Sequence, residues 1–135
     1  MMACKAALFS DTATLELILE ENTKPETDPK DLKALGRRIT PFDEGTWIEH
    51  REDIVYVGNL CKFGQNEELR KLLLGTGRLI LVEASPYDKI WGIGVREDKA
   101  MEKESWGLNL LGKALMRTRE ELAKEQRDSE VETKL

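Results

Sequence analysis

One short apolar run, followed by a turn rich in acids and glycine, constrains the fold of this chain more than any other segment. Residues 79–84 are apolar except for Glu83, and a proline lies two residues beyond them. A run of this length predicts a buried strand, and the proline ends it. Asp88, Trp91 and Gly92 follow in the turn. Polar side chains in a loop that is positioned by a scaffold are well placed for chemistry.

Glu83 has two interpretations. Alternate side chains of a strand point the same way, so Glu83 shares a face with Leu79 and Leu81. A carboxylate among such neighbours loses hydration, which suits it to proton transfer. The alternative is a glutamate that only accepts bonds from loop amides. Trp91 also has two interpretations: its ring either fills space in the core or stays available to stack on a planar ligand. Gly92 either lets a ligand approach the backbone or lets the turn adopt positive φ.

Start and stop signals outside this run are mostly those of helices. Asp28 caps a predicted helix that has Pro29 in its first turn and ends at Gly36. A longer helix is predicted from about Asp43 to Phe63, and Asn66 caps the next one.

The last predicted helix has one apolar stripe. Its leucines are Leu108, Leu111, Leu115 and Leu122. The chain is polar beyond Leu122, so we expect one domain over residues 1–125 and a disordered tail over residues 126–135.

Composition narrows the class of protein. The chain has 135 residues, enough for one domain, and 35% of them are charged. A net charge of -5 argues against broad nucleic-acid binding, and no apolar run approaches the roughly 18 residues of a membrane span. Two cysteines and a single histidine predict neither a disulfide framework nor a metal site. A reducing, cytoplasmic location is therefore expected.

Several separate motifs resemble, in the same order, those of the NADAR family, which includes riboflavin-biosynthesis intermediate N-glycosidases. They are Cys61-Lys62-Phe63, the segment LVEASPYDKIWGIG from Leu81 to Gly94, and the segment WGLNLLGKALM from Trp106 to Met116. The resemblance is collinear from about Met1 to Leu122. With the patterns above, it leads us to expect an α+β fold, mainly helical around a small sheet.

The resemblance implies hydrolysis of an N-glycosidic bond at the anomeric carbon of a ribose, without a cofactor. The implied substrates are ribosylamino-pyrimidine phosphates of the riboflavin pathway or ADP-ribosylated guanine, including a modified base in nucleic acid. We expect Asp88 and Glu83 to be the catalytic acids. The substrate-binding residues are expected to be Trp47, Lys62, Trp91, Gly92 and Asn109.

One departure from the family concerns the N-terminus. In family members, a helix begins with a Ser-Val-Glu-Gln or Ser-Val-Glu-His motif, whose glutamate is thought to be catalytic, and ends in a segment that resembles residues 1–6. This chain starts inside that helix. We therefore expect an N-terminally truncated domain, and little N-glycosidase activity from these residues alone. The alternative function is a catalytically inactive domain that binds ADP-ribose-like ligands. An exposed sheet edge would also favour oligomerisation.

Overall fold

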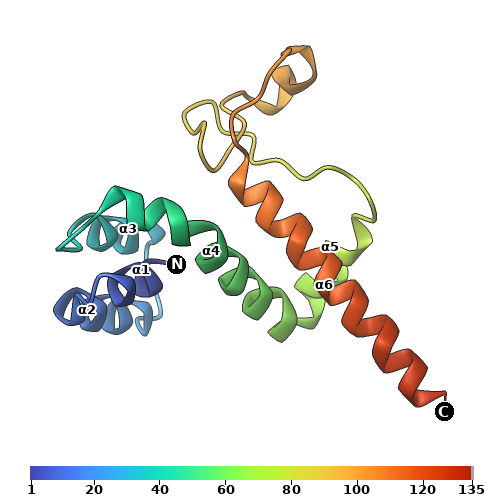
Figure 1. The fold of residues 1–135 in the computed structure, drawn as a ribbon, viewed down its shortest axis with the longest axis horizontal. Coiled ribbons are helices and arrows are strands. Elements are labelled where there is room, and N and C mark those ends of the chain that lie inside the picture. The colour runs from blue at the N-terminus through green and yellow to red at the C-terminus, as the bar shows by residue number, and fades with distance from the viewer. Residues whose placement is uncertain (135) are drawn as a thin grey trace. The chain divides into compact units, whose positions relative to one another are not determined.

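The computed structural model describes residues 1–134, and within them every regular element is helical (Figure 1). The chain divides into two units, Met1–Ile54 and Val55–Leu135. The elements in chain order are α1 (Met2–Leu8), α2 (Thr12–Asn22), α3 (Pro29–Arg37), α4 (Glu44–Gln65), α5 (Glu67–Gly75), the 3-10 helix η1 (Glu97–Glu102) and α6 (Leu110–Thr133).

The first unit is built on three short helices, α1, α2 and α3, that pack against one another. Ala6, Ile18 and Ile39 form its buried centre. Partly buried side chains surround them: Met2, Ala3, Phe9, Leu15, Leu32 and Leu35. Each of the three helices is too short to be stable alone, so this shared apolar contact is what stabilises them.

The predicted helix that begins after Asp28 is confirmed at its start. The Asp28 carboxylate accepts a hydrogen bond from Lys30 N at 2.8 Å. Its predicted end at Gly36 is wrong, because α3 continues to Arg37. Gly36 is buried inside the helix, where a Cβ atom would lie 2.1 Å from the Met2 sulfur. The absence of a side chain there lets α1 approach α3.

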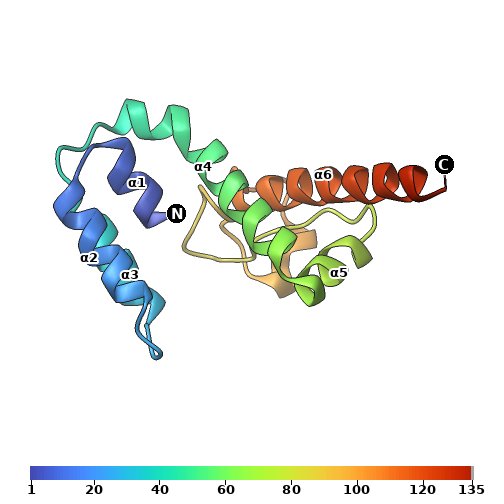
Figure 2. The same cartoon turned by 90° about the horizontal axis from the view of Figure 1, so that it is seen from below.

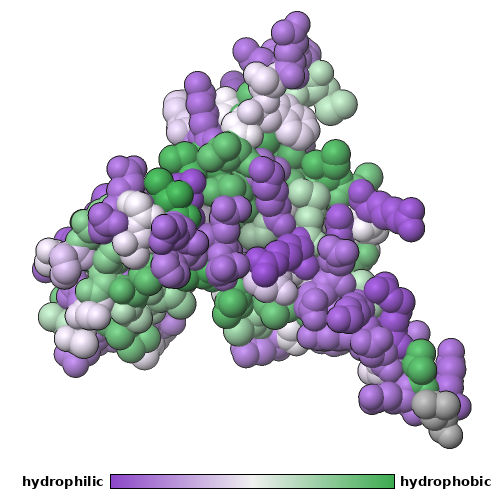
Figure 3. Space-filling view, in the orientation of Figure 1, coloured by the Kyte–Doolittle hydropathy of each residue, from purple (hydrophilic) through white to green (hydrophobic). Residues whose placement is uncertain are grey.

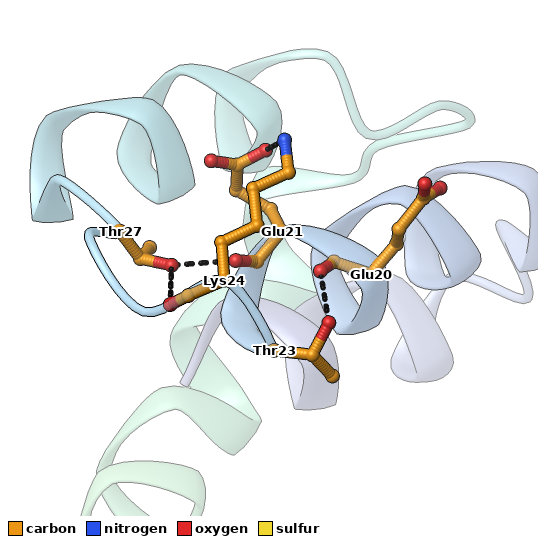
Figure 4. Close-up of polar contacts among 5 residues, drawn as sticks. All are labelled: Glu20, Glu21, Thr23, Lys24 and Thr27. Atoms are coloured by element: carbon orange, nitrogen blue, oxygen red, sulfur yellow. Dashed lines mark hydrogen bonds and ion pairs between the residues drawn. The ribbon is translucent and has the colours of Figure 1, made fainter.

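Threonine hydroxyls hold the turn between α2 and α3 (Figure 4). Thr23 Oγ1 donates to Glu20 O at 2.7 Å, and Thr27 Oγ1 donates to Glu21 O at 2.6 Å. The Lys24 ammonium pairs with the Glu21 carboxylate, which raises the pKa of Lys24. These bonds satisfy the last carbonyls of α2, as helix ends require.

Two further helix starts agree with the sequence. Asp43 accepts from Thr46 N at 2.7 Å before α4, and Asn66 accepts from Leu69 N at 3.1 Å before α5. The predicted long helix, about Asp43 to Phe63, corresponds to α4, and it crosses the boundary between the two units.

Helices α5 and α6 contact each other in the second unit. Leu73 on α5 and Thr118 and Leu122 on α6 are buried, and the Arg70 guanidinium donates to Leu122 O at 3.3 Å. The predicted stripe is confirmed at Leu122, which is buried, but Leu108 precedes the helix and is half exposed. Four of the five buried positions of α6 recur at helical spacing, Leu110, Ala114, Thr118 and Leu122, and the fifth is Gly112.

The predicted α+β fold is wrong. No strand occurs in residues 1–134, and the predicted strand over residues 79–84 belongs to an irregular connection between α5 and α6 (Figures 1 and 2). A strand needs a neighbouring strand to pair its backbone groups. Side chains take part of that role here: Arg119 donates to Leu79 O at 2.9 Å, and Asn109 donates to Leu81 O at 2.9 Å. The described residues therefore offer no sheet edge for oligomerisation.

Residues 126–133, predicted as part of a disordered tail, continue α6 as helix. Half of these residues are good helix formers, namely Gln126, Arg127, Glu130 and Glu132, and Gln126 donates to Glu130 at 3.1 Å across one turn. Residue 135 lies outside the described residues. None of the helices in the described part of the chain is long and apolar enough to cross a membrane.

Candidate functional site

Asn109 joins two distant segments of the second unit at the start of α6. It is buried and has φ 51° and ψ 44°, a left-handed conformation that asparagine tolerates better than most residues. Its Oδ1 accepts from Glu83 N at 3.1 Å, and its Nδ2 donates to Leu81 O at 2.9 Å. Both ends of the amide are therefore used to hold residues 81–83 beside the helix.

Backbone bonds hold the glycine-rich turn against the same helix start. Five consecutive amides, of residues 107–111, donate to carbonyls of residues 89–93. The pairs are Gly107 to Ile93 at 2.8 Å, Leu108 to Lys89 at 2.8 Å, Asn109 to Gly92 at 3.1 Å, Leu110 to Ile90 at 3.1 Å, and Leu111 to Trp91 at 3.1 Å. The amides at 110 and 111 belong to the first turn of α6, where no partner exists within the helix.

Gly92 lies where the turn meets the segment of Glu83. A Cβ atom on Gly92 would be 2.7 Å from Glu83 O and 2.8 Å from Asp88 O. Ile93 N donates to Glu83 O at 2.9 Å in the same place. Protein backbone thus occupies the space that glycine leaves, whereas Gly94 is the residue with positive φ, 70°.

Asp88 organises the turn with one carboxylate oxygen. Its Oδ1 accepts from Ile90 N at 2.9 Å and from Trp91 N at 2.8 Å. Aspartate commonly shapes turns by bonding backbone amides a few residues ahead. The described contacts leave Oδ2 without a hydrogen bond, so this oxygen is available to a ligand.

Glu83 is exposed, and its carboxylate has no described hydrogen bond or ion pair within residues 1–134. This environment differs from the desolvated one that the strand pattern predicts. The reason is local: Leu79 is 69% exposed, because residues 79–84 are not packed on both faces. Water can reach the Glu83 carboxylate directly.

The structure brings together five of the predicted site residues, all within the second unit: Glu83, Asp88, Trp91, Gly92 and Asn109. Trp91 is partly buried. The other two predicted residues lie on α4 and have no described bond to this group. Lys62 Nζ lies 5.5 Å from the Phe63 ring centroid. Trp47 belongs to the first unit.

Trp47 has a cationic neighbour of its own. Lys5 Nζ lies 5.3 Å from the Trp47 ring centroid, donates to Gly36 O at 3.1 Å, and has its pKa lowered by burial. An ammonium over a ring face is a favourable contact. Lys5 therefore occupies part of the surface that a stacking role would need.

Sequence reasoning missed the side chains that line the cavities of the second unit. Arginines at 78, 117, 119 and 127 surround one cavity, and Trp106 lines two others. Trp106 stands in a quoted motif and could have been chosen. The arginines come from a loop and a helix and form no local pattern. No group of three or more His, Cys, Asp or Glu that could hold a metal occurs in the described residues.

Comparison with known proteins identifies a family and several relatives of this chain. A NADAR domain model matches residues 1–123. An N-glycosidase of Acanthamoeba polyphaga mimivirus is 47% identical over 124 residues, which cover 90% of this chain and 70% of that protein. An N-glycosidase of Nostoc punctiforme is 40% identical, over 70% of this chain and 55% of that protein. The chloroplastic riboflavin biosynthesis protein PYRR of Zea mays is 35% identical, over 76% of this chain and 16% of that protein.

The fold and the site define a class of helical protein in which loop segments are hydrogen-bonded to the start of the last helix. The family match and these relatives make the identity specific: the chain belongs to the NADAR domain family. The predicted resemblance is confirmed.

Proposed function

We propose that this chain is an N-glycosidase-type hydrolase domain that acts on ribosylated small molecules. One observation supports this proposal most directly. The NADAR match and the similarity to proteins named N-glycosidase both include the loops that contain Glu83, Asp88 and Trp91. The riboflavin biosynthesis protein among its relatives favours ribosylamino-pyrimidine phosphates as one substrate. ADP-ribosylated guanine is the second substrate class.

Hydrolysis of an N-glycosidic bond requires an attacking water, cleavage of the bond and transfer of a proton. A water molecule adds to the anomeric carbon of the ribose, the bond from that carbon to nitrogen breaks, and a proton goes to the departing base. The transition state resembles an oxocarbenium ion, which a nearby carboxylate stabilises. Glu83 is exposed and unpaired among the described residues, so we assign it the role of activating water. The Trp91 ring would stack on the base.

Asp88 and Asn109 have supporting roles in this proposal. The Oδ1 atom of Asp88 positions Trp91 through its backbone amide, and Oδ2 remains for the substrate. Asn109 positions Glu83 through the Glu83 amide. Lys62 and Trp47 remain predicted substrate contacts. Both cysteines are exposed and free, which suits a reducing compartment such as the cytoplasm.

The test is release of free base by the purified chain, measured by chromatography in single turnover with protein in excess, so that the low activity expected of these residues alone can be detected. The substrates are a ribosylamino-pyrimidine phosphate and ADP-ribosylated guanine. Glu83→Gln should lower the rate by about 10²- to 10⁴-fold, the usual contribution of a positioned acid or base. Glu68→Gln, at another exposed glutamate, is the matched control and should leave the rate unchanged.

A non-catalytic function is the alternative, and the engaged oxygen of Asp88 favours it. In that case ADP-ribose binds in a calorimetric titration while no base is released from either substrate. Equal rates for wild type and Glu83→Gln would remove Glu83 from the chemistry.

A further inference from the structure

The segment 79–84 is hydrogen-bonded along one edge of its backbone. Figure 1 shows that the connection after α5 runs without helical turns here. The carbonyls of its odd-numbered residues all have partners. They are Leu79 O, which accepts from Arg119 at 2.9 Å, Leu81 O, which accepts from Asn109 at 2.9 Å, and Glu83 O, which accepts from Ile93 N at 2.9 Å. These partners fix the segment in place.

The even-numbered residues leave the opposite edge open. Neither the amide nor the carbonyl of Ile80 or Val82 makes a hydrogen bond with any of residues 1–134. Consecutive residues of an extended segment direct their backbone groups to opposite edges. Gly112 lies at the paired edge, since a Cβ atom there would be 2.1 Å from Leu81 O. The edge at Ile80 and Val82 therefore has donors and acceptors free for another chain.

A hollow of about 590 Å³, here called the apolar hollow, includes Ile80 and Val82 in its lining. Its apolar residues are Leu79, Ile80, Val82, Ala100, Met101 and Trp106. Ile80 is 70% exposed, and Met101 is 91% exposed. The Trp106 indole donates to Ala100 O at 2.9 Å, which fixes the ring. Figure 3 shows hydrophobic residues over the connection that follows α5, and an exposed patch of this kind is typical of an interaction site.

The apolar hollow also carries positive charge. Arg78 and Lys103 complete its lining, which includes no acidic residue of residues 1–134. Both cations are exposed, and neither makes an ion pair within the described part of the chain. Glu102, the neighbour of Lys103, pairs with Lys99 instead. The charge that complements this surface is therefore acidic.

A second copy of the chain does not supply that charge. Two copies paired about a two-fold axis through this segment would bring identical surfaces together. Each would present Arg78 and Lys103, and like charges that face each other oppose association. A different segment, apolar in the middle and acidic at its ends, complements both the side chains and the charge.

We propose that residues 80–82 bind a partner protein by strand addition, through an extended segment that alternates apolar residues and has acidic ends. Backbone groups of Ile80 and Val82 pair with the partner, one of its apolar side chains enters the hollow, and its carboxylates pair with the two cations. In this binding mode main-chain bonds give affinity and side-chain pockets give specificity. Residues 1–134 contain no strand pair of their own, so the pairing arises only with the partner. Neither Glu83 nor Asp88 lines the hollow.

Fluorescence anisotropy of the full chain with a labelled peptide, Glu-Thr-Val-Thr-Val-Thr-Glu, tests the proposal. Two further peptides of the same sequence carry N-methyl groups on alternate amides, one on the odd positions and one on the even. A strand pairs along one edge, so one methylated peptide should lose binding and the other should keep it. Equal effects of the two methylation patterns, or no binding of the unmodified peptide, would overturn strand addition.

A matched pair of variants tests the apolar contact. Ile80→Ser should weaken the peptide by about tenfold, because the side chain that becomes buried on binding loses most of its apolar surface. Leu72→Ser changes a leucine that is 69% exposed on α5, outside the hollow, and should leave binding unchanged. Both positions are exposed, so both variants should melt near the wild-type temperature. An equal loss for the two variants would place the peptide elsewhere.

Charge variants test the acidic ends. Arg78→Gln and Lys103→Gln should each weaken the peptide by about two- to fivefold, the usual contribution of an exposed ion pair. Lys124→Gln, at an exposed cation of α6 outside the hollow, is the control. A peptide with lysine in place of both glutamates should bind more weakly, and equal binding would contradict the proposal. Light scattering that shows a dimer which the peptide does not dissociate would make a second copy the occupant. Base release is measured separately, so this proposal and the hydrolase proposal can fail independently.

Discussion

Asn109 and Glu83 are joined by a hydrogen bond from the Glu83 amide to Asn109 Oδ1, 3.1 Å long, across 26 positions of sequence. The bond uses the backbone of Glu83 and leaves its carboxylate to face solvent. Asn109 is therefore a positioning residue in the proposed site. Its own conformation is left-handed, which asparagine adopts more readily than most residues.

Replacing Asn109 should separate its hydrogen bonds from its conformation. Asn109→Asp keeps an acceptor for the Glu83 amide but places a second acceptor opposite Leu81 O. We expect a loss of about 1–3 kcal/mol in the free energy of unfolding, the usual result when a buried group loses its partner. Asn109→Gly keeps the left-handed backbone and loses both bonds. Urea denaturation of the two variants measures each effect, and wild-type stability for Asn109→Asp would contradict the described bonds.

Substitutions at Asp88 should distinguish shape from charge. Asp88→Asn retains an oxygen for the amides of Ile90 and Trp91, so the turn should persist. If the carboxylate acts on the substrate, base release falls by about 10²- to 10⁴-fold while the melting temperature is kept. Asp88→Ala should lower both quantities, because it removes the turn bonds as well. Near-normal turnover in Asp88→Asn would make Asp88 purely structural.

Trp91→Leu keeps much of the apolar volume and removes the wide ring face. A stacking role predicts weaker ligand binding by a protein that still folds. A role in the core predicts a lower melting temperature with little change in affinity. Thermal melting and ligand titration on the same sample separate these outcomes, and an unchanged result in both would exclude each role.

The stability of the chain should fall in acid because of Asp11. Hydrogen bonds from Thr14 and from the Thr40 amide lower the pKa of this carboxyl below the usual 3.8. The folded state therefore binds the proton less readily than the unfolded state, and Asp11 stabilises fully above pH 3.8. That contribution is lost as the pH falls from there through the lower, folded-state pKa. Denaturation of wild type and Asp11→Asn from pH 6 to pH 2 should show a steeper decline for wild type.

Local signals in the sequence predicted the helix starts well. Asp28 and Asn66 act as caps because their short side chains reach amides in the next turn, a property of the residues themselves. The end of α3 was missed because Gly36 serves packing against Met2, which is a tertiary contact.

The strand prediction failed for a similar reason. An apolar run shows that residues 79–84 can form a strand, but pairing requires a partner that the described residues lack. Glu83, Asp88, Trp91 and Asn109 lie within two of the family motifs, and the structure holds these two segments together. The hollow lined by Arg78 and Arg127 could not be predicted from local sequence patterns, because these residues come from a loop and a helix that are far apart in the sequence.

The five backbone bonds between residues 89–93 and 107–111 close a loop of chain without depending on the loop's length. Lengthening a closed loop is entropically cheap, about 0.6 kcal/mol for each doubling. The exposed residues Arg96 and Glu97 lie within this loop, away from the closing bonds. A reporter peptide or a fluorophore carrier inserted between them should leave the rest of the domain intact, which gives protein engineers a permissive insertion point.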